Sequence, residues 1–270
     1  MEVRTFPNSI RPGIGMTPRQ EGQRPLLPQH ARHCPVLEAG SALGFLVYPA
    51  LAPNESFHVQ YEGEGRYHLT YFISGPGGRW EPVFSLALRL PMGGIGMTRE
   101  QVTFATGNRP FPNEDASKLA RAFIVPEDMG TPPGAVALRG ATNFRTPSGW
   151  DTVYAPVFNA IDRPVAPMLV VRVETDWYAH SSEFRYVLQP GEGISGAHNM
   201  PVGQVFFVPR EEVALRDCGK EELESIYASM DEFSREKARA QQHNPLGTHH
   251  SPLYTRRSRE QKEKDGKPVD

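Results

Sequence analysis

The amino-acid sequence predicts a mainly β protein, a β-sandwich or jelly-roll-like domain with a C-terminal helix and a disordered tail. Three observations support this class. The 26 prolines and 25 glycines recur through the first three quarters of the chain, where they favour turns over long helices. Many short segments there alternate apolar and polar residues with a period of two, as half-buried strands do. Only the region after Gly219 carries a long apolar stripe at helical spacing.

The clearest pair of strands lies at residues 56–63 and 66–73. Phe57 and Val59 share one face of the first segment, and Tyr67 and Leu69 share one face of the second. The string EGEG between them is typical of a tight turn. These segments therefore predict a β-hairpin.

Further strands are predicted wherever an alternating or β-branched run is bounded by turn residues. Glycine- and proline-rich strings such as GPGG, TPPG and GEGISG separate them. About ten short strands with such turns are typical of a sandwich or jelly roll. The additional strands are expected at 43–49, 81–90, 101–106, 135–144, 151–158, 168–176, 183–189 and 203–210.

Two helices are predicted. A short one is expected at 113–123, where Asn113 or Asp115 can cap it. A longer one is expected at 220–242, and its apolar stripe should pack on the sandwich. The stripe consists of Leu223, Ile226, Tyr227, Met230 and Phe233.

These elements divide the chain into three parts. Residues 1–28 contain five prolines and are expected to be an N-terminal arm, laid over the core or loose. Residues 29–242 form a single β-sandwich domain that includes the C-terminal helix. Residues 243–270 are polar and charged without periodicity, and we expect a disordered tail.

Composition excludes several classes of protein. The formal net charge of -2 gives no global attraction to nucleic acid or to an anionic membrane, so neither is expected as a partner. Cys34 and Cys218 stand far apart, which fits a reducing cytoplasmic location. No apolar run reaches the length of a membrane span, and polar residues and prolines at the N-terminus stand where a signal peptide needs an uninterrupted apolar stretch. Walker and nucleophile-elbow motifs are absent, and the oligomeric state stays open.

Histidines on the predicted hairpin raise a metal hypothesis. His58 and His68 belong to paired strands and can meet on one polar face. Glu62 would complete a set of two histidines and a carboxylate, the ligands of many non-haem iron sites. The alternative is that both are solvated or hydrogen-bonded strand histidines.

The segment 168–176 carries two acids on one face. Alternation places Arg172, Glu174 and Asp176 on the same side, with the carboxylates about 7 Å apart along the strand. If this face meets solvent, the row is an ordinary salt-bridged surface. If it faces a cavity or a loop, the paired acids would have perturbed pKa values and could bind a metal or transfer protons.

Residues 144–150, FRTPSGW, predict two strands joined by a tight turn at Pro147-Ser148-Gly149. Such a hairpin would bring Arg145 and Trp150 to the same end. Glu174 and Asp176 could then face Arg145, with Trp177 beside them. This arginine, carboxylate and tryptophan cluster is either a working site or a structural staple of the sandwich.

Several linked motifs resemble a bacterial and phage family catalogued as domain of unknown function 6065, most clearly over residues 138–212. Members of that family have PPGW or EPGW where this chain has Pro147-Ser148-Gly149-Trp150. An aromatic-rich strand stands in place of residues 179–188. The resemblance implies a shared fold for the middle strands with a different pocket, and it supplies no reaction. The strings that carry it are FRTPSGW (144–150), VETDW (173–177), FRYVLQPGEG (184–193) and GQVFFVPREE (203–212).

Two functions fit these residues. The first is a tailoring enzyme for a small metabolite or peptide, in the form of an oxidation that depends on a divalent metal such as iron. Arg145 would hold an anionic group, Trp150 and Trp177 would line the walls, and Glu174 and Asp176 would act as acid and base or as metal ligands. The second is a non-catalytic binding protein, accessory to a larger assembly, in which Arg145, Trp150 and Trp177 form the recognition surface.

Overall fold

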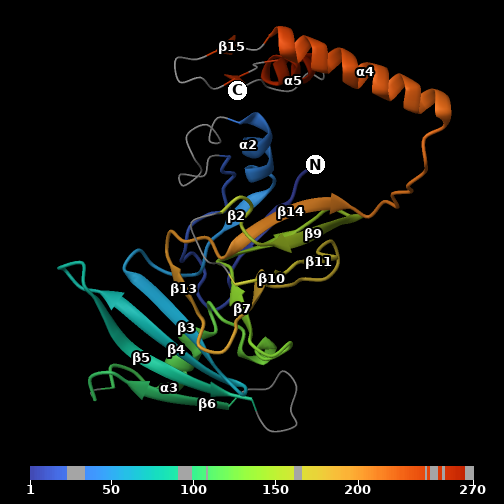
Figure 1. Cartoon of the computed structure of the whole chain (residues 1–270). Helices are drawn as coiled ribbons and strands as arrows, with labels where there is room; N and C mark the ends of the chain where they lie inside the picture. The colour runs from blue at the N-terminus through green and yellow to red at the C-terminus, as the bar shows by residue number, and fades with distance from the viewer. Residues whose placement is uncertain are drawn as a thin grey trace. The chain divides into compact units, whose positions relative to one another are not determined.

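The computed structural model describes residues 1–22, 34–90, 99–107, 109–160, 166–240, 242–243, 249–250 and 253–264. The chain divides into two compact units, Met1–Glu211 and Glu212–Asp270. Antiparallel sheets build the first unit, so the predicted mainly β class is confirmed (Figure 1). The division falls before the long helix, whereas the sequence prediction placed that helix in the β domain.

The largest sheet has five antiparallel strands in the order β13-β3-β4-β5-β6. It contains the predicted hairpin, in which Phe57 pairs with Tyr71 and Val59 with Leu69. Glu64 and Gly65 form the turn with φ of 51° and 73°, and positive φ at both central residues matches the twist of the hairpin. The strands are β3 (Glu55–Gly63), β4 (Arg66–Ser74), β5 (Trp80–Arg89), β6 (Arg99–Phe104) and β13 (Gly193–Ala197).

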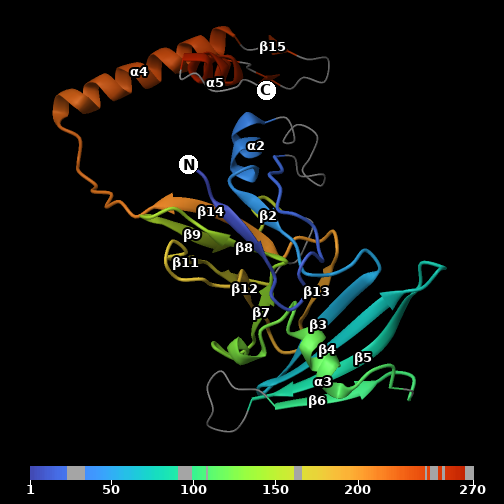
Figure 2. The same cartoon turned by 180° about the vertical axis from the view of Figure 1, so that it is seen from behind.

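Three smaller antiparallel sheets complete the first unit. Their strand orders are β11-β9-β14-β2, β10-β12-β7 and β1-β8. Figure 2 shows β1 and β8 beside β9 and β14, seen from behind. The bounds are β1 (Arg4–Pro7), β2 (Phe45–Val47), β7 (Ala135–Arg139), β8 (Thr142–Arg145), β9 (Trp150–Ala155), β10 (Met168–Leu169), β11 (Val171–Val173), β12 (Glu183–Val187) and β14 (Gly203–Pro209).

An aromatic core lies on the inward face of the five-stranded sheet. Phe123 stacks on Phe57 with ring centroids 4.7 Å apart, and it stacks on Tyr71 at 6.0 Å. It follows helix α3 (Asn113–Ala120), which confirms the predicted short helix, although no side chain caps its first turn. The first unit also contains helix α2 (Pro35–Ser41) and the 3₁₀ turn η1 (Pro126–Asp128), neither of which was predicted.

The N-terminal segment is built into this unit. Strand β1 pairs with β8, and Asn8 is buried with its amide donating to the carbonyls of Ala122 and Gly140 at 2.8 and 3.1 Å. Arg11 forms a two-armed ion pair with Glu55, at 2.5 and 2.9 Å. The described part of the predicted arm therefore contributes a strand and buried contacts, and residues 23–28 lie outside the described residues.

Two strand assignments need correction. Strands β8 and β9 exist where expected, yet they do not pair as a hairpin: β8 pairs with β1, and β9 pairs with β11 and β14. The predicted strand at 168–176 ends at Val173, because the chain turns at Thr175.

Strand β13 was missed because its glycines were interpreted as a turn. Pairing with β3 requires them, since a Cβ on Gly193 would lie 2.5 Å from the His58 ring. A Cβ on Gly196 would lie 2.3 Å from the Phe57 ring. These close approaches leave no room for a side chain at either position.

The second unit holds the predicted long helix, α4 (Lys220–Arg239), and the Glu222 carboxylate in its first turn accepts a hydrogen bond from the Gly219 N–H at 2.9 Å. No residue of α4 is buried, and the side chains of its stripe from Leu223 to Met230 are exposed. Packing of this stripe on the sandwich stays a prediction. No helix in the described part of the chain is long and apolar enough to cross a membrane.

The region predicted to be a disordered tail contains described elements as well. They are β15 (Gln242–His243), β16 (His249–His250) and helix α5 (Leu253–Lys264). Arg257 of α5 pairs with Glu236 at 2.5 Å and lies over the Phe233 ring. The rest of this region lies outside the described residues.

Candidate functional site

Three segments far apart in the sequence meet at the start of β9. In the sheet, Trp150 pairs with Pro209 at the end of β14, and the Arg210 N–H donates to the Gly149 carbonyl at 2.8 Å. On the other side, Val173 of β11 pairs with Thr152, so the turn after β11 lies beside the same corner. We call residues 145–151, 172–178 and 209–210 the β9 corner.

A buried carboxylate forms the centre of the β9 corner. Asp151 has a side chain only 3% exposed, and each of its oxygens accepts from an arginine. Arg172 Nε donates to Oδ2 at 2.6 Å, and Arg210 Nε donates to Oδ1 at 2.8 Å. Pairing on both oxygens offsets the cost of burying this charge.

Arg210 continues the network to a second carboxylate. Its Nη2 donates to Asp176 Oδ1 at 2.6 Å, and the Gly149 N–H donates to Asp176 Oδ2 at 2.9 Å. The Gly149 hydrogen bond, and after it the Arg210 pair, hold the pKa of Asp176 below its ordinary value of 3.8. The hydrogen bonds from Arg210 to Asp151 and Asp176 raise the pKa of the arginine in turn.

Three buried threonines join the two loops of the corner. Thr175 Oγ1 is 2.9 Å from Thr146 Oγ1 and 2.7 Å from Thr152 Oγ1. Thr146 also donates to the Trp150 carbonyl at 2.6 Å. These bonds fix the turn after β11 against the turn before β9, so the surface of the corner is held by a rigid base.

The arginine that pairs with Asp176 is Arg210, whereas the sequence pointed to Arg145. Asp176 is paired with Arg210, because β9 adds to β14 rather than to β8. Arg145 instead lies directly opposite Arg4 on β1. Sequence reasoning missed Asp151 and Arg210 as members of the cluster, although Arg210 is the last residue of the strand predicted at 203–210.

Glu174 and the two tryptophans differ in exposure. Glu174 is on the surface and accepts a hydrogen bond from Trp177 Nε1 at 2.5 Å. Trp150 is half-buried, whereas Trp177 is 64% and Tyr178 48% exposed, with ring centroids 5.7 Å apart. The corner thus presents an aromatic pair to solvent, and its carboxylates are already hydrogen-bonded within the protein.

The predicted metal pair lies elsewhere, on the outward face of the five-stranded sheet. His58 is opposite Thr70 and His68 is opposite Gln60, so the two histidines are diagonal neighbours. His58 Nδ1 lies 2.8 Å from Ser195 Oγ, and burial, followed by the charge of His68, lowers the pKa of His58. Among the described residues, no group of three or more histidines, cysteines and acids is arranged to hold a metal ion.

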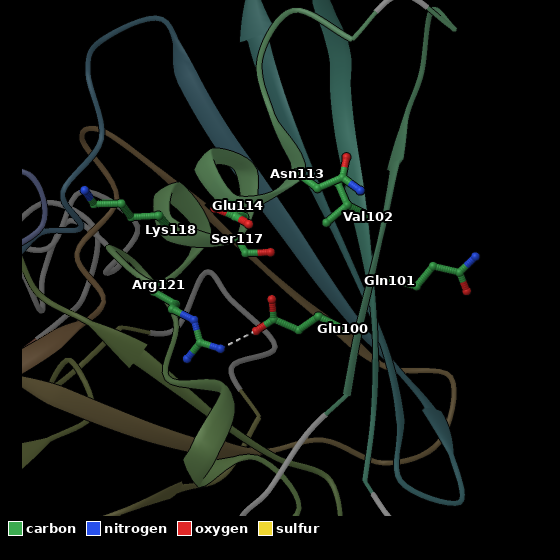
Figure 3. Close-up of a pocket in the computed structure, with 8 residues that line it drawn as sticks. All are labelled: Glu100, Gln101, Val102, Asn113, Glu114, Ser117, Lys118 and Arg121. Carbon is green, nitrogen blue, oxygen red and sulfur yellow. Dashed lines mark hydrogen bonds and ion pairs between the residues drawn. The ribbon is translucent and has the colours of Figure 1, made fainter.

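An open pocket of about 600 Å³ lies between β6 and α3 (Figure 3). Arg121 pairs there with Glu100 at 2.6 Å and also with Glu127. Figure 3 shows Gln101 turned away from α3, on the other side of β6. Because the arginine of this pocket is paired with two carboxylates, it is not free to bind an anion. The lining residues are Glu100, Gln101, Val102, Asn113, Glu114, Ser117, Lys118 and Arg121.

Comparisons with known proteins leave the site to be interpreted from its own geometry. No family model, no curated protein and no solved structure matches the chain. The resemblance to the domain of unknown function 6065 stays a prediction.

Proposed function

We propose that this protein is a non-catalytic binding protein that recognises an acidic peptide segment of a partner at the β9 corner. The observation that carries the proposal is the exposure of Trp177 and Tyr178 on a turn that is fixed from below. Large aromatic side chains that are exposed yet rigidly held are typical anchors of protein interfaces. They contact a partner at little cost in conformational entropy.

Arg145 and Arg4 favour a negatively charged partner. These residues face each other across β8 and β1, and like charges placed directly opposite destabilise a strand pair. Neither side chain forms a hydrogen bond or an ion pair within the described part of the chain. A carboxylate that accepts from both guanidinium groups would relieve this repulsion.

Arg145 ends strand β8, and the loop that follows it adjoins the turn that carries the aromatic pair. Thr146, the residue after Arg145, bonds to Thr175, which is two residues before Trp177. A peptide side chain can therefore reach the aromatic pair while a neighbouring acidic group reaches the arginines. This arrangement favours a segment that combines acidic and apolar residues.

The network geometry favours binding over catalysis at this corner. Asp176 accepts from Arg210 and Gly149, which keeps it ionised and occupies both of its oxygens. A general acid or base needs a pKa near the working pH, and that of Asp176 is shifted the opposite way. The oxidation hypothesis consequently gains no support from Glu174 and Asp176.

The test is a fluorescence anisotropy titration with a labelled peptide of alternating aspartate and leucine. Peptides of alternating lysine and leucine, and of alternating aspartate and serine, serve as controls. We expect the aspartate-leucine peptide to bind most tightly, and Arg145→Ala to weaken it about tenfold, as loss of one charged hydrogen-bonded contact does. Equal binding of the acidic and basic peptides would overturn the proposal.

A further inference from the structure

A second set of arginines that lie directly opposite one another is on the outward face of the five-stranded sheet. Arg66 on β4 is directly opposite Arg89 on β5, and Arg89 is directly opposite Arg99 on β6. We call these three residues the arginine row. Figure 1 shows the three strands side by side, with β5 in the middle.

The three side chains share one face because of the alternation of each strand. Tyr67, Leu88 and Leu86 next to them are buried in the core, so Arg66 and Arg89 point outward. Arg99 likewise is an exposed position of β6, where exposure alternates along the strand. All three guanidinium groups therefore reach the same solvent-facing surface.

The charge of the arginine row is largely uncompensated. The side chains of Arg89 and Arg99 form no hydrogen bond or ion pair with any residue the structure describes. Arg66 pairs with Glu64 at 3.4 Å, and this acid is 84% exposed. Glu62, near the end of β3, is another exposed acid of this hairpin. Three like charges in register repel one another, so an anion that contacts them would be stabilised.

The spacing of the arginine row sets the length of the anion. Directly opposed residues in an antiparallel pair are about 5 Å apart, so the row spans about 10 Å. One oxyanion can bridge two neighbouring guanidinium groups, but only a longer anion can contact all three. Arginine forks match the geometry of phosphate oxygens.

The surroundings of the row on this face include several polar side chains. In the next rows of the same face lie His68 and Gln101, and beyond them Thr70, whose hydroxyl is 3.1 Å from that of Ser85. These groups can donate or accept hydrogen bonds at the edge of a bound anion.

We propose that the arginine row binds the polyphosphate chain of a small ligand, such as a pyrophosphate or triphosphate group. The chain lies across β4, β5 and β6, with successive phosphates on Arg66, Arg89 and Arg99. This site is on a different sheet from the β9 corner. Binding of polyphosphate at the arginine row therefore does not depend on peptide binding at the β9 corner.

The test is isothermal titration calorimetry of the full chain with inorganic tripolyphosphate at constant ionic strength, compared with orthophosphate and sulfate. We expect tripolyphosphate to bind at least tenfold more tightly than either single anion. Arg89→Ala should weaken it about tenfold, and Arg99→Ala should act in the same direction. Glu64→Gln should strengthen it, because Arg66 then loses its competing partner.

Arg79→Ala is the matched control, since Arg79 is an exposed arginine at the other end of the same β4 and β5 pair. Its affinity for tripolyphosphate should equal that of the unchanged protein. Circular dichroism melting verifies that each variant is folded. An equal loss of affinity for tripolyphosphate in Arg79→Ala and Arg89→Ala would overturn the proposal. Binding of a short oligonucleotide by a protein that does not bind tripolyphosphate would also overturn it.

Discussion

Arg210 donates to Asp176 at 2.6 Å, and through its Nε it also reaches the buried Asp151 at 2.8 Å. One guanidinium therefore joins the end of β14, the start of β9 and the turn after β11. The exposed Trp177 follows Asp176 directly in the chain, so this ion pair positions the proposed binding surface.

Removing the central carboxylate should destabilise the fold. Asp151→Asn removes the negative charge that Arg172 and Arg210 share, while the side chain keeps its size. We expect the free energy of unfolding to fall by about 2 kcal/mol, since a buried charged hydrogen bond is lost. Urea denaturation measures this change. Glu174→Gln, at an exposed position, should shift the free energy by less than about 0.5 kcal/mol; equal effects would contradict the network.

Stability should depend on pH through Asp176. The folded-state pKa lies below the ordinary value of 3.8, so the unfolded chain binds more protons in acid than the folded one. The contribution of Asp176 is therefore complete above about pH 5 and is lost as the pH falls through the folded pKa. We expect the stability difference between the unchanged protein and Asp176→Asn to be constant above about pH 5 and to narrow below it. A difference that stays constant down to about pH 3 would count against the Arg210 pair.

The N-terminal segment should contribute to global stability. Asn8→Ala removes two donated hydrogen bonds to buried carbonyls, together with the acceptor of the Ile10 N–H. We expect a loss of about 2 kcal/mol in urea denaturation, because buried carbonyls lose their donors. Asn54→Ala is the matched control, since Asn54 is exposed. If both variants lose the same stability, residues 1–22 are an arm rather than part of the fold.

The turn before β9 should need glycine because of its backbone conformation and not because a side chain would lack space. Gly149 has φ of 80°, and no atom lies within 4 Å of the position a Cβ would take. Gly149→Ala should cost about 1 kcal/mol, because L residues disfavour the left-handed region. Gly77→Ala, where space is equally open and φ is not positive, should be neutral or slightly stabilising in the same thermal melts. A neutral Gly149→Ala would show that the turn rearranges.

The sequence predicted most strands but not the partners of the strands at the site. Alternation identified β3, β4 and β5, because one of their faces is buried and the residues that face the core are large and apolar. The pairing of β9 with β14 joins segments about fifty residues apart, and no local pattern reveals it. The local sequence consequently points to Arg145 as the partner of the acids, whereas the sheet brings Arg210 to Asp176. The glycines of β13 concealed a strand whose tight packing on His58 and Phe57 requires them.

Because local sequence does not reveal which strands pair, only some of the site residues could be predicted. The turn before Trp150 and the turn that carries Asp176 and Trp177 are joined by Thr146 with Thr175 and by Gly149 with Asp176. The roles predicted for these residues stay predictions. The buried role of Asp151 depends on its neighbours in the folded sheet, and nothing in its local sequence signals it.

The most direct test of the proposed binding surface is the affinity of the aspartate-leucine peptide for Trp177→Ala relative to Trp80→Ala. Both tryptophans are exposed, at 64% and 45%, so both variants should keep the stability of the unchanged protein. We expect Trp177→Ala to weaken binding at least tenfold, as loss of an aromatic anchor does, and Trp80→Ala to leave it unchanged. Equal affinities of the two variants would contradict recognition at the β9 corner.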